Sequence, residues 1–412
     1  MDESKIEVYE NKKNRFSSIR LLCLFPILLL TILVFEAPLS KYIGCMSYAD
    51  EISTIILFVS GVYKWCLKKN KIDKFYLPFI LGILVYGIFG WLSTMLYQLQ
   101  NASTSIFSSF LSQKFFLTVI GCSLIERYDR NDSFLNAMKI IARPIFIIVI
   151  IARLLNYIHP YEFGYDLLSY CGLLIFLLSV IIADYKSKDV LLIFIGGVML
   201  FITGAAKAIG GMIILVAIYC WIIKLHKKIK LYDIIVLGIL IIILAWQSIY
   251  VYYIYGATVD YPRAMTMLGG IKVANTAFPL GSGWGTFASY YASVFYSPVY
   301  VKLGWENHYI LGKGIGEHFL TDNYWPSIFA ETGWIGFAGF FISLLALIIE
   351  LSKLYYFDKK LYASSMLIIG FMFVTTFESS SFANPAYYIL SIPIGIYLGR
   401  YFKEKDDKRR FS

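Results

Sequence analysis

The strongest constraint on this chain is a series of apolar segments of about twenty residues each, which recurs along nearly its whole length. A helix of this length crosses the hydrocarbon core of a bilayer, which is about 30 Å thick. Because no water is available there, a lipid-exposed segment satisfies its backbone polar groups by forming a helix. The segments run over residues 20–37, 48–66, 75–97, 107–125, 140–158, 165–183, 189–206, 208–223, 231–254, 326–349, 361–378 and 384–401. The sequence therefore predicts an all-α polytopic membrane protein with about twelve transmembrane helices.

The composition agrees with a chain that lies mostly in lipid. Hydrophobic residues make up 58% of the chain and charged residues 16%, whereas about a quarter of an average soluble chain is charged. No long polar domain interrupts the series, so we expect residues 1–412 to form one integral membrane domain. The first segment has the charged flank and apolar run of a signal peptide, but no small-x-small cleavage site follows cleanly. We therefore expect an uncleaved first span.

The positive charges predict the orientation of the chain. With the N-terminus inside, 29 of the 37 lysines and arginines fall in the cytoplasmic stretches between the segments. Omitting one helix would invert every later stretch, so this bias supports the helix count as well as the orientation. We expect both termini in the cytoplasm and the chain in a bacterial cytoplasmic (inner) membrane. The net charge of +10 is spread over short basic runs, so the expected partner is the lipid bilayer and not nucleic acid.

One long segment between the predicted helices covers residues 255–325, on the outer side. A loop of this length is usually functional. It is rich in aromatic residues, namely Tyr290, Tyr291, Phe295, Tyr296, Tyr300, Trp305 and Tyr309. These side chains fit short helices that lie at the lipid headgroups, where Tyr and Trp are favoured. They also fit a wall on which sugar rings stack, and the sequence leaves both interpretations open.

Four cations lie at depths where positive charge is costly. Lys114 and Arg153 lie at the outer ends of apolar segments, Lys207 in the break at 203–211, and Arg263 at the start of the outer loop. Snorkelling to the headgroups, or pairing with a local acid, explains Lys114 and Arg153 as well as a function does. For Lys207 and Arg263 we favour a function, because lysine supplies a point charge and arginine a fork of donors for phosphate oxygens.

Several common catalytic motifs are missing from the sequence. There is no HExxH, GxSxG or DxD motif, and the glycine runs at 281–285 and 312–316 match neither a P-loop nor a dinucleotide-binding fingerprint. The six cysteines are scattered, without the spacing of a zinc site or a disulfide framework. We therefore expect no metal and no cofactor, and the pattern argues against soluble-type hydrolases and cytoplasmic glycosyltransferases.

Several stretches of the sequence resemble the O-antigen polymerase and O-antigen ligase superfamily. Members of this family show an arginine, then Pro-x-x-Gly-x-Gly, then His-Asn or Asp-Asn, then Ala-Glu-x-Gly-x-x-Gly entering a helix. Here these positions correspond to Arg263, to Pro279–Phe287 and to Thr321–Gly336. The break Thr203–Lys207 resembles a short outer turn of the family that more often reads Thr-Gly-Ser-Arg, so lysine keeps the charge but loses the fork. The motifs cover residues 200–340, and the rest of the chain resembles the family in hydropathy and topology.

The resemblance implies a membrane-embedded glycosyltransferase of the GT-C type. Its donor is a glycan on undecaprenyl pyrophosphate, and neither a nucleotide sugar nor a metal is required. In polymerases the acceptor is the next lipid-linked repeat unit, and the product is O-antigen or a capsular or exopolysaccharide. In ligases the acceptor is lipid A–core, and a His stands where this chain has Asp322, so the sequence favours the polymerase branch. The resemblance also implies a chain-length-regulating co-polymerase as a partner.

The chemistry of such a transfer assigns roles to these residues. The acceptor hydroxyl is a poor nucleophile and needs a base, for which Asp322 is the first candidate, His318 the second and Glu317 the third. The pyrophosphate leaving group needs positive charge more than it needs a proton. The residues expected to bind it are Arg263, Lys207, Arg153 and Lys114.

Four residues are expected to position the substrate, namely Asn323, Glu331, Gly281 and Gly283. Glu331 also suits the N-terminus of the following helix, where an acid is stabilising in any case. Gly333 is expected to permit close packing between helices.

Two alternatives to a polymerase stay open. A ligase would transfer the glycan to a different acceptor. A flippase for lipid-linked oligosaccharide would need cations along a cavity reached from both sides, and usually has paired halves of similar hydropathy. Here the four cations cluster on the outer side and one asymmetric loop dominates, which favours an enzyme acting at the outer face.

Overall fold

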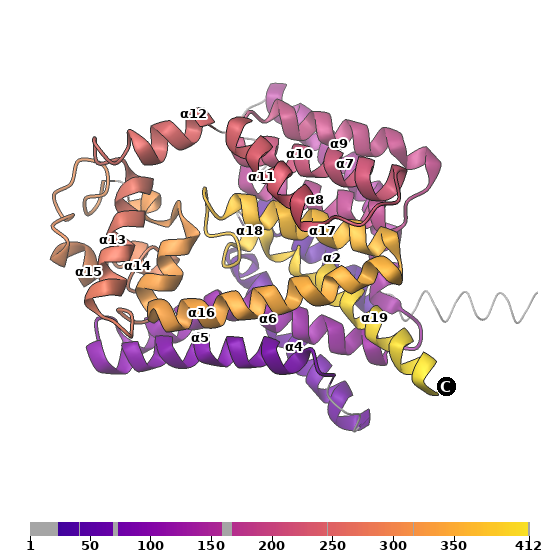
Figure 1. The fold of residues 1–412 in the computed structure, drawn as a ribbon, viewed down its shortest axis with the longest axis horizontal. Helices are drawn as coiled ribbons and strands as arrows, with labels where there is room; N and C mark the ends of the chain where they lie inside the picture. Colours follow the sequence, from indigo (N-terminus) through magenta and orange to yellow (C-terminus); the bar gives the residue numbers. More distant parts are fainter. Residues whose placement is uncertain are drawn as a thin grey trace, which may run out of the picture. The chain divides into compact units, whose positions relative to one another are not determined.

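The computed structural model describes residues 24–40, 42–68, 73–158, 167–244, 246–315 and 317–410. Within these residues all regular elements are helices and no strand is present, which confirms the predicted all-α class (Figure 1). The contacts divide the chain into two compact units. Unit 1 lies within Met1–Asn70, Leu117–Gly196 and Ile389–Ser412, and unit 2 lies within Lys71–Phe116 and Gly197–Tyr388.

Six helices in the described part of the chain are long and apolar enough to cross a membrane. They are Gly44–Lys68, Tyr76–Tyr97, Ala102–Tyr128, Ser133–Leu155, Ala206–Lys224 and Tyr324–Tyr356. The pair Tyr232–Ile243 and Trp246–Ile254, bent by 68°, makes a seventh when it is taken as one span. All of these overlap predicted apolar segments, as expected of a polytopic membrane protein.

The remaining predicted spans are shorter or less apolar helices. Leu24–Val34 and Tyr170–Ala183 are apolar but shorter than a full span. Residues 20–23 and 165–166 of the corresponding predicted segments lie outside the described residues. Three more predicted segments overlap the helices α9 (Val190–Ile202), α17 (Lys359–Thr375) and α19 (Ser391–Arg410), of which α19 extends nine residues beyond the end of its segment. The count of twelve spans therefore stays a prediction.

Unit 1 is built around a helix that is buried on every side. All described side chains of α8 (Leu167–Ala183) from Tyr170 onward are buried, as expected for a helix that is apolar all round. It packs on α7 (Ser133–Ile158). The unit also contains α2 (Leu24–Val34), α3 (Glu36–Ser40), η1 (Gly44–Tyr48), α4 (Ala49–Lys68), the end of α6 (Ala102–Tyr128), η2 (Ser187–Asp189), the start of α9, and the whole of α19.

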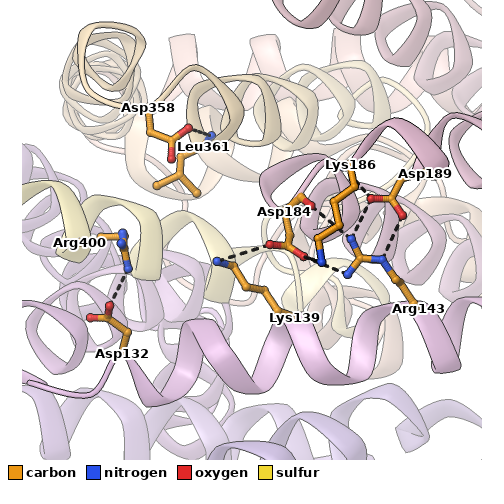
Figure 2. Close-up of polar contacts among 9 residues, drawn as sticks. All are labelled: Asp132, Lys139, Arg143, Asp184, Lys186, Asp189, Asp358, Leu361 and Arg400. Carbon is orange, nitrogen blue, oxygen red and sulfur yellow. Dashed lines mark hydrogen bonds and ion pairs between the residues drawn. The ribbon is translucent and has the colours of Figure 1, made fainter.

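Ion pairs tie together the polar ends of the unit 1 helices (Figure 2). Arg143 in α7 donates to both carboxylate oxygens of Asp189, at 2.8 and 3.1 Å, and to Asp184 at 3.0 Å. Arg400 in α19 donates to Asp132 at 2.6 Å. Partial burial opposes ionisation of Asp184 and Asp189, yet the hydrogen bonds from Arg143 hold the pKa of both carboxyl groups below its ordinary value. These residues lie at or beside the ends of the segments that are predicted to face the cytoplasm, so part of the charge expected there serves to join helices.

Unit 2 is organised around a long pair of helices, α5 (Tyr76–Tyr97) and α16 (Tyr324–Lys353), which run side by side (Figure 1). Glycines permit their close approach, since a Cβ on Gly339 would lie 2.7 Å from the carbonyl oxygen of Gly82. Further helices of the unit are the start of α6, the end of α9, α10 (Ala206–Ile218), η3 (Tyr219–Lys224), α11 (Leu231–Leu244), α12 (Trp246–Ile249), η4 (Tyr250–Ile254), η6 (Leu354–Tyr356), α17 and α18 (Pro385–Tyr388).

The predicted outer loop at 255–325 contains short helices and a small core of its own. The helices are α13 (Pro262–Thr276), α14 (Tyr290–Val294), α15 (Pro298–Lys302) and η5 (Glu317–Thr321). Tyr300 and Trp305 are buried, with ring centres 5.6 Å apart, and the Tyr300 hydroxyl accepts a hydrogen bond from the Ala288 amide at 2.8 Å. Tyr290 and Tyr309 are exposed. Only some of the aromatic residues are therefore available to headgroups or sugar rings, and the choice between these two stays open.

Candidate functional site

Helix α16 is broken near its N-terminal end by Gly333. Gly333 has φ 74° and ψ 176°, so the helix runs from Tyr324 to Thr332 and resumes at Trp334. This φ value favours glycine, because any other L residue would be strained there. A Cβ on Gly333 would also lie 2.5 Å from the carbonyl oxygen of Pro279. The sequence predicted close packing at Gly333, and the structure shows that this packing goes together with a break in the helix.

The segment Leu280–Ser289, which we call the glycine loop, fills the break. The amide of Ser282 donates to the carbonyl of Ala330 at 2.7 Å, and the amide of Gly283 donates to the carbonyl of Glu331 at 2.9 Å. A break in a membrane helix leaves carbonyl groups without their usual partner, and in lipid each must find another. The glycine loop provides these partners and so connects the 255–325 segment to α16.

The side chain of Glu331 also binds the glycine loop, in addition to the backbone carbonyls of α16. One of its carboxylate oxygens, Oε1, accepts from the amides of Thr286 and Phe287 at 2.9 and 3.0 Å and from the Ser289 hydroxyl at 2.6 Å. Glu331 is almost completely buried, at 1% exposure. It lies well inside α16, which begins at Tyr324, so its contacts are with the loop and not with the first turn of the helix. Glu331 therefore holds the loop in place, and a direct role in positioning substrate stays a prediction.

Gly281 and Gly283 lie at the contact between the glycine loop and its neighbours. The amide of Gly281 donates to the Ser93 hydroxyl of α5 at 2.9 Å. Gly283 has φ 98°, and a Cβ there would lie 2.8 Å from the Cα of Thr94. Both glycines are buried. They allow the loop to approach α5 and α16, and their predicted contact with substrate stays a prediction.

The structure brings together two residues that the sequence assigned to different roles, Arg263 and Asp322. Arg263 is the second residue of α13, and its Nη2 lies 3.8 Å from Oδ2 of Asp322. The guanidinium carbon lies 4.4 Å from the ring centre of Tyr252, where cation and aromatic ring attract each other. The side chains of Arg263 and Asp322 are 16% and 33% exposed, so the pair remains accessible. We call the group formed by Arg263, Asp322, Tyr252 and the neighbouring Asn323 the arginine site.

Asn323, next to Asp322, is a polar residue whose side chain has no partner. It occupies the N-cap position of α16, but its side chain makes no capping hydrogen bond. The side chain is fully buried, and both its oxygen and its nitrogen lack a hydrogen-bond partner in the described part of the chain. A buried amide in this condition is costly and calls for an explanation. Its predicted role in positioning substrate is one such explanation.

The loop after α17 also contributes to the arginine site, and the sequence did not predict this. The hydroxyl of Tyr253, in η4, donates to the carbonyl of Phe377 at 2.7 Å. The same hydroxyl lies within electrostatic reach of Arg263, Asp322 and Glu378. The predicted span at 361–378 assigned these residues to lipid. The polar run Glu378–Ser381, directly after an apolar segment, is the signal that could have indicated the site.

The other predicted cations lie in three different helices. Lys207 is the second residue of α10 and is 8% exposed. Lys114, in α6, is fully buried, and its ammonium lies 5.8 Å from the ring centre of Tyr388. Both belong to unit 2, as Arg263 does, whereas Arg153 belongs to unit 1 and lies 5.2 Å from the ring centre of Tyr170. Their joint action on a pyrophosphate stays a prediction.

The two remaining base candidates, Glu317 and His318, lie five and four residues before Asp322 in the sequence. Glu317 and His318 begin the short helix η5, which ends at Thr321. Their side chains lie outside the described residues, so their part in the site stays a prediction. Asp322 is thus the one sequence-predicted base whose side chain the structure describes.

His308 organises part of the 255–325 segment through its ring. Its Nδ1 accepts hydrogen bonds from the amides of Ile310 and Leu311, at 3.2 and 3.0 Å. Burial lowers the pKa of His308, although the nearby charge of Asp260 acts in the opposite direction. A ring that accepts at Nδ1 is neutral, so His308 has a structural role at neutral pH.

Among the described residues, no group of three or more His, Cys, Asp or Glu side chains is arranged to hold a metal ion. The polar groups described at the arginine site are one arginine, two carboxylates, an amide and a tyrosine hydroxyl, and the glycine loop is bound by a third carboxylate, that of Glu331. The chain matches no protein-family model, and a search of curated proteins found no match.

Proposed function

We propose that this chain is a membrane-embedded glycosyltransferase that polymerises oligosaccharide repeat units carried on undecaprenyl pyrophosphate. It acts at the outer face of the cytoplasmic membrane, with about twelve spans and a GT-C-like architecture. The observation that carries the proposal is the contact between Arg263 and Asp322 at the N-terminal end of a broken membrane helix. Residues from motifs far apart in the sequence meet there, and the motifs are those that resemble O-antigen polymerases.

Arg263 is suited to bind the pyrophosphate of the lipid-linked donor. Its guanidinium is 16% exposed and is held over Tyr252, which fixes its orientation while leaving donors for phosphate oxygens. The leaving group of the transfer is an anion, and a preorganised positive charge stabilises it as the bond to the sugar breaks. The contact with Asp322 is long for a hydrogen bond, at 3.8 Å, so Arg263 has donors left for a ligand.

The acceptor needs a carboxylate close to this cation. A hydroxyl of the next repeat unit attacks the anomeric carbon, the bond from that carbon to the pyrophosphate oxygen breaks, and the hydroxyl proton moves to a base. Asp322 lies next to Arg263, and the buried amide of Asn323 follows it. These groups support a transfer between two lipid-linked substrates, in which donor phosphate and acceptor hydroxyl meet at one end of α16.

The test is a gel of surface and lipid-linked glycan from a strain that lacks this chain, complemented with wild type, Arg263→Ala or Lys272→Ala. Lys272 is an exposed cation on the same helix and serves as the matched control. We expect Arg263→Ala to lower polymerisation by about a hundredfold or more, so that single repeats replace the ladder. We expect Lys272→Ala to restore it.

Other patterns on the gel would contradict the proposal. Full-length polymer that accumulates on the lipid carrier would identify a ligase. Single repeats trapped on the cytoplasmic face would identify a flippase. A normal ladder with Arg263→Ala would show that polymerisation does not need Arg263.

A further inference from the structure

The loop after α17 is fixed by backbone contacts to both sides of the arginine site. The carbonyl of Thr376 accepts from the amide of Tyr324, the first residue of α16, at 3.1 Å. The carbonyl of Phe377 accepts from the Tyr253 hydroxyl at 2.7 Å. Both contacts precede Glu378 directly in the sequence. The loop therefore joins the end of η4 to the N-terminus of α16, the two elements that flank Arg263 and Asp322.

The same loop is also held by its own hydrogen bonds. The amide of Glu378 donates to the carbonyl of Thr375 at 3.0 Å, and the Ser379 hydroxyl donates to the same carbonyl at 3.2 Å. The Ser381 hydroxyl donates to the Thr375 hydroxyl at 2.7 Å. Glu378 thus lies in a turn that is closed by hydrogen bonds, so its backbone is fixed beside the arginine site. Its side chain is half-buried.

The two carboxylates at this site differ in their partners. Asp322 lies 3.8 Å from the guanidinium of Arg263. The carboxylate of Glu378 takes part in none of the hydrogen bonds or ion pairs of the described residues. It does act electrostatically on the Tyr253 hydroxyl, as Arg263 and Asp322 do. One carboxylate is therefore engaged by the cation and the other is available.

This difference matters for proton transfer. An adjacent cation stabilises the ionised form of a carboxylate, and so weakens that carboxylate as a proton acceptor. The cation itself is needed for the pyrophosphate under the proposed function. A carboxylate that has no cation partner among the described residues, and that acts on the same tyrosine hydroxyl as Arg263, is better suited to remove a proton from a neutral hydroxyl.

We propose that Glu378 is the catalytic base of the transfer, and that Asp322 is a positioning residue that orients Arg263. This assignment rests on the proposed function. The acceptor oxygen forms its bond to the anomeric carbon, the bond to the pyrophosphate oxygen breaks, and the hydroxyl proton passes to Glu378. Undecaprenyl pyrophosphate leaves with the electron pair of the broken bond, and Glu378 returns its proton to water before the next cycle.

The experiment uses the full chain in lipid nanodiscs, with labelled undecaprenyl-pyrophosphate repeat unit purified from a strain that lacks the chain. Polymerisation is followed over a range of pH for wild type, Glu378→Gln, Glu378→Ala, Asp322→Asn, Asp322→Ala and Glu306→Gln. Glu306 is an exposed acid of the 255–325 segment and serves as the control. Binding of the labelled donor is measured separately, so that loss of a base is distinguished from loss of the site.

We expect Glu378→Gln to lower kcat by about a hundredfold or more, with little change in donor binding. We expect the loss of rate that wild type shows toward acidic pH to disappear in this variant. Formate, a small carboxylate, should restore part of the activity of Glu378→Ala. Asp322→Asn should weaken donor binding through Arg263, and Glu306→Gln should behave as wild type.

Three results would overturn the assignment. The first is Glu378→Gln activity within about threefold of wild type, which is too small a loss for a general base. The second is an inactive Glu378→Gln that no longer binds donor. The third is recovery of Asp322→Ala, and not of Glu378→Ala, by formate. Wild type that binds donor but never extends it would instead contradict the proposed function.

Discussion

The glycine loop and the arginine site both contact α16, yet they differ in how far the hydrogen bonds of their polar groups are satisfied. At the glycine loop, Glu331 accepts three hydrogen bonds through one oxygen, and the freed carbonyls of α16 receive two more. At the arginine site, the amide of Asn323 has no partner among the described residues, and Arg263 and Asp322 meet at a distance longer than a hydrogen bond.

The difference indicates which region is scaffold and which is built to receive a ligand. Buried polar groups that are fully satisfied make a structure rigid, whereas an unsatisfied buried group destabilises it. Such a cost is tolerated where a substrate or a conformational change later supplies the missing partner. The glycine loop thus fixes the backbone near the site, whereas at the arginine site the described residues leave the Asn323 amide unsatisfied and hold Arg263 to Asp322 by a contact of 3.8 Å.

The largest expected effect comes from removing the acceptor at the centre of the scaffold. Glu331→Ala leaves the amides of Thr286 and Phe287 and the Ser289 hydroxyl without a partner. We expect a loss of about 4 kcal/mol in the free energy of unfolding, since each buried unsatisfied group costs about 1–3 kcal/mol. The measurement is unfolding of the purified chain in detergent, with Glu306→Ala as an exposed control.

The opposite result would assign Glu331 to the arginine site instead of to the scaffold. If Glu331→Ala unfolded like wild type but lost polymerisation, its carboxylate would act on substrate and not on the loop. Glu306→Ala should change the free energy of unfolding by less than about 0.5 kcal/mol, as most exposed substitutions do.

A smaller effect of opposite sign is expected at Asn323. Asn323→Leu replaces a buried, unpartnered amide by an apolar group of similar size, so we expect the free energy of unfolding to rise by about 1 kcal/mol. Polymerisation should nevertheless fall, because the amide is lost from the site. The matched control is Asn275→Leu, since Asn275 accepts a hydrogen bond from Trp334 at 2.8 Å and should lose stability. If Asn323→Leu instead lowered the free energy of unfolding, the Asn323 amide would have a structural role at the N-terminus of α16.

The sequence predicted the scaffold and the site unequally. Apolar segments of membrane-spanning length are a local property, and the long apolar helices of the structure overlap them closely. The break at Gly333 was not visible, because Glu-Thr-Gly-Trp-Ile-Gly continues the apolar helix pattern and the sequence does not show φ. Its cause lies in the Pro279–Leu280 backbone, which is far away in the sequence.

The same limit applies to the pairing of charges. Arg263 and Asp322 were both selected from the sequence, as a phosphate ligand and a base, but nothing local indicated that they would contact each other. Glu378 was missed because the apolar pattern of 361–378 runs up to it, so a hydropathy argument assigns it to the end of a span. Contacts between side chains from different helices depend on packing, which a periodicity cannot report.

The smallest expected effect is a change with pH confined to the 255–325 segment around His308. His308 Nδ1 accepts from Ile310 and Leu311, and burial lowers the pKa of His308, so the fold favours the neutral ring. The contribution of this ring to stability is present above the ordinary histidine pKa of about 6.5 and is lost as the pH falls below it. At pH 5.5 we expect the amides of Ile310 and Leu311 to exchange hydrogen about five- to tenfold faster, after correction for intrinsic rates. His308→Gln should remove this dependence.

The amides of Ser282 and Gly283 provide the internal reference for this measurement. They donate to backbone carbonyls of α16, which do not titrate, so their protection should not change between pH 7.5 and 5.5. Equal loosening of both sets of amides would show that the outer segment and the glycine loop open as one unit. Loosening at Ile310 and Leu311 alone would show that the segment ahead of η5 responds to pH while the scaffold at the α16 break stays closed. The two regions would then differ in their opening motions as well as in their hydrogen bonds.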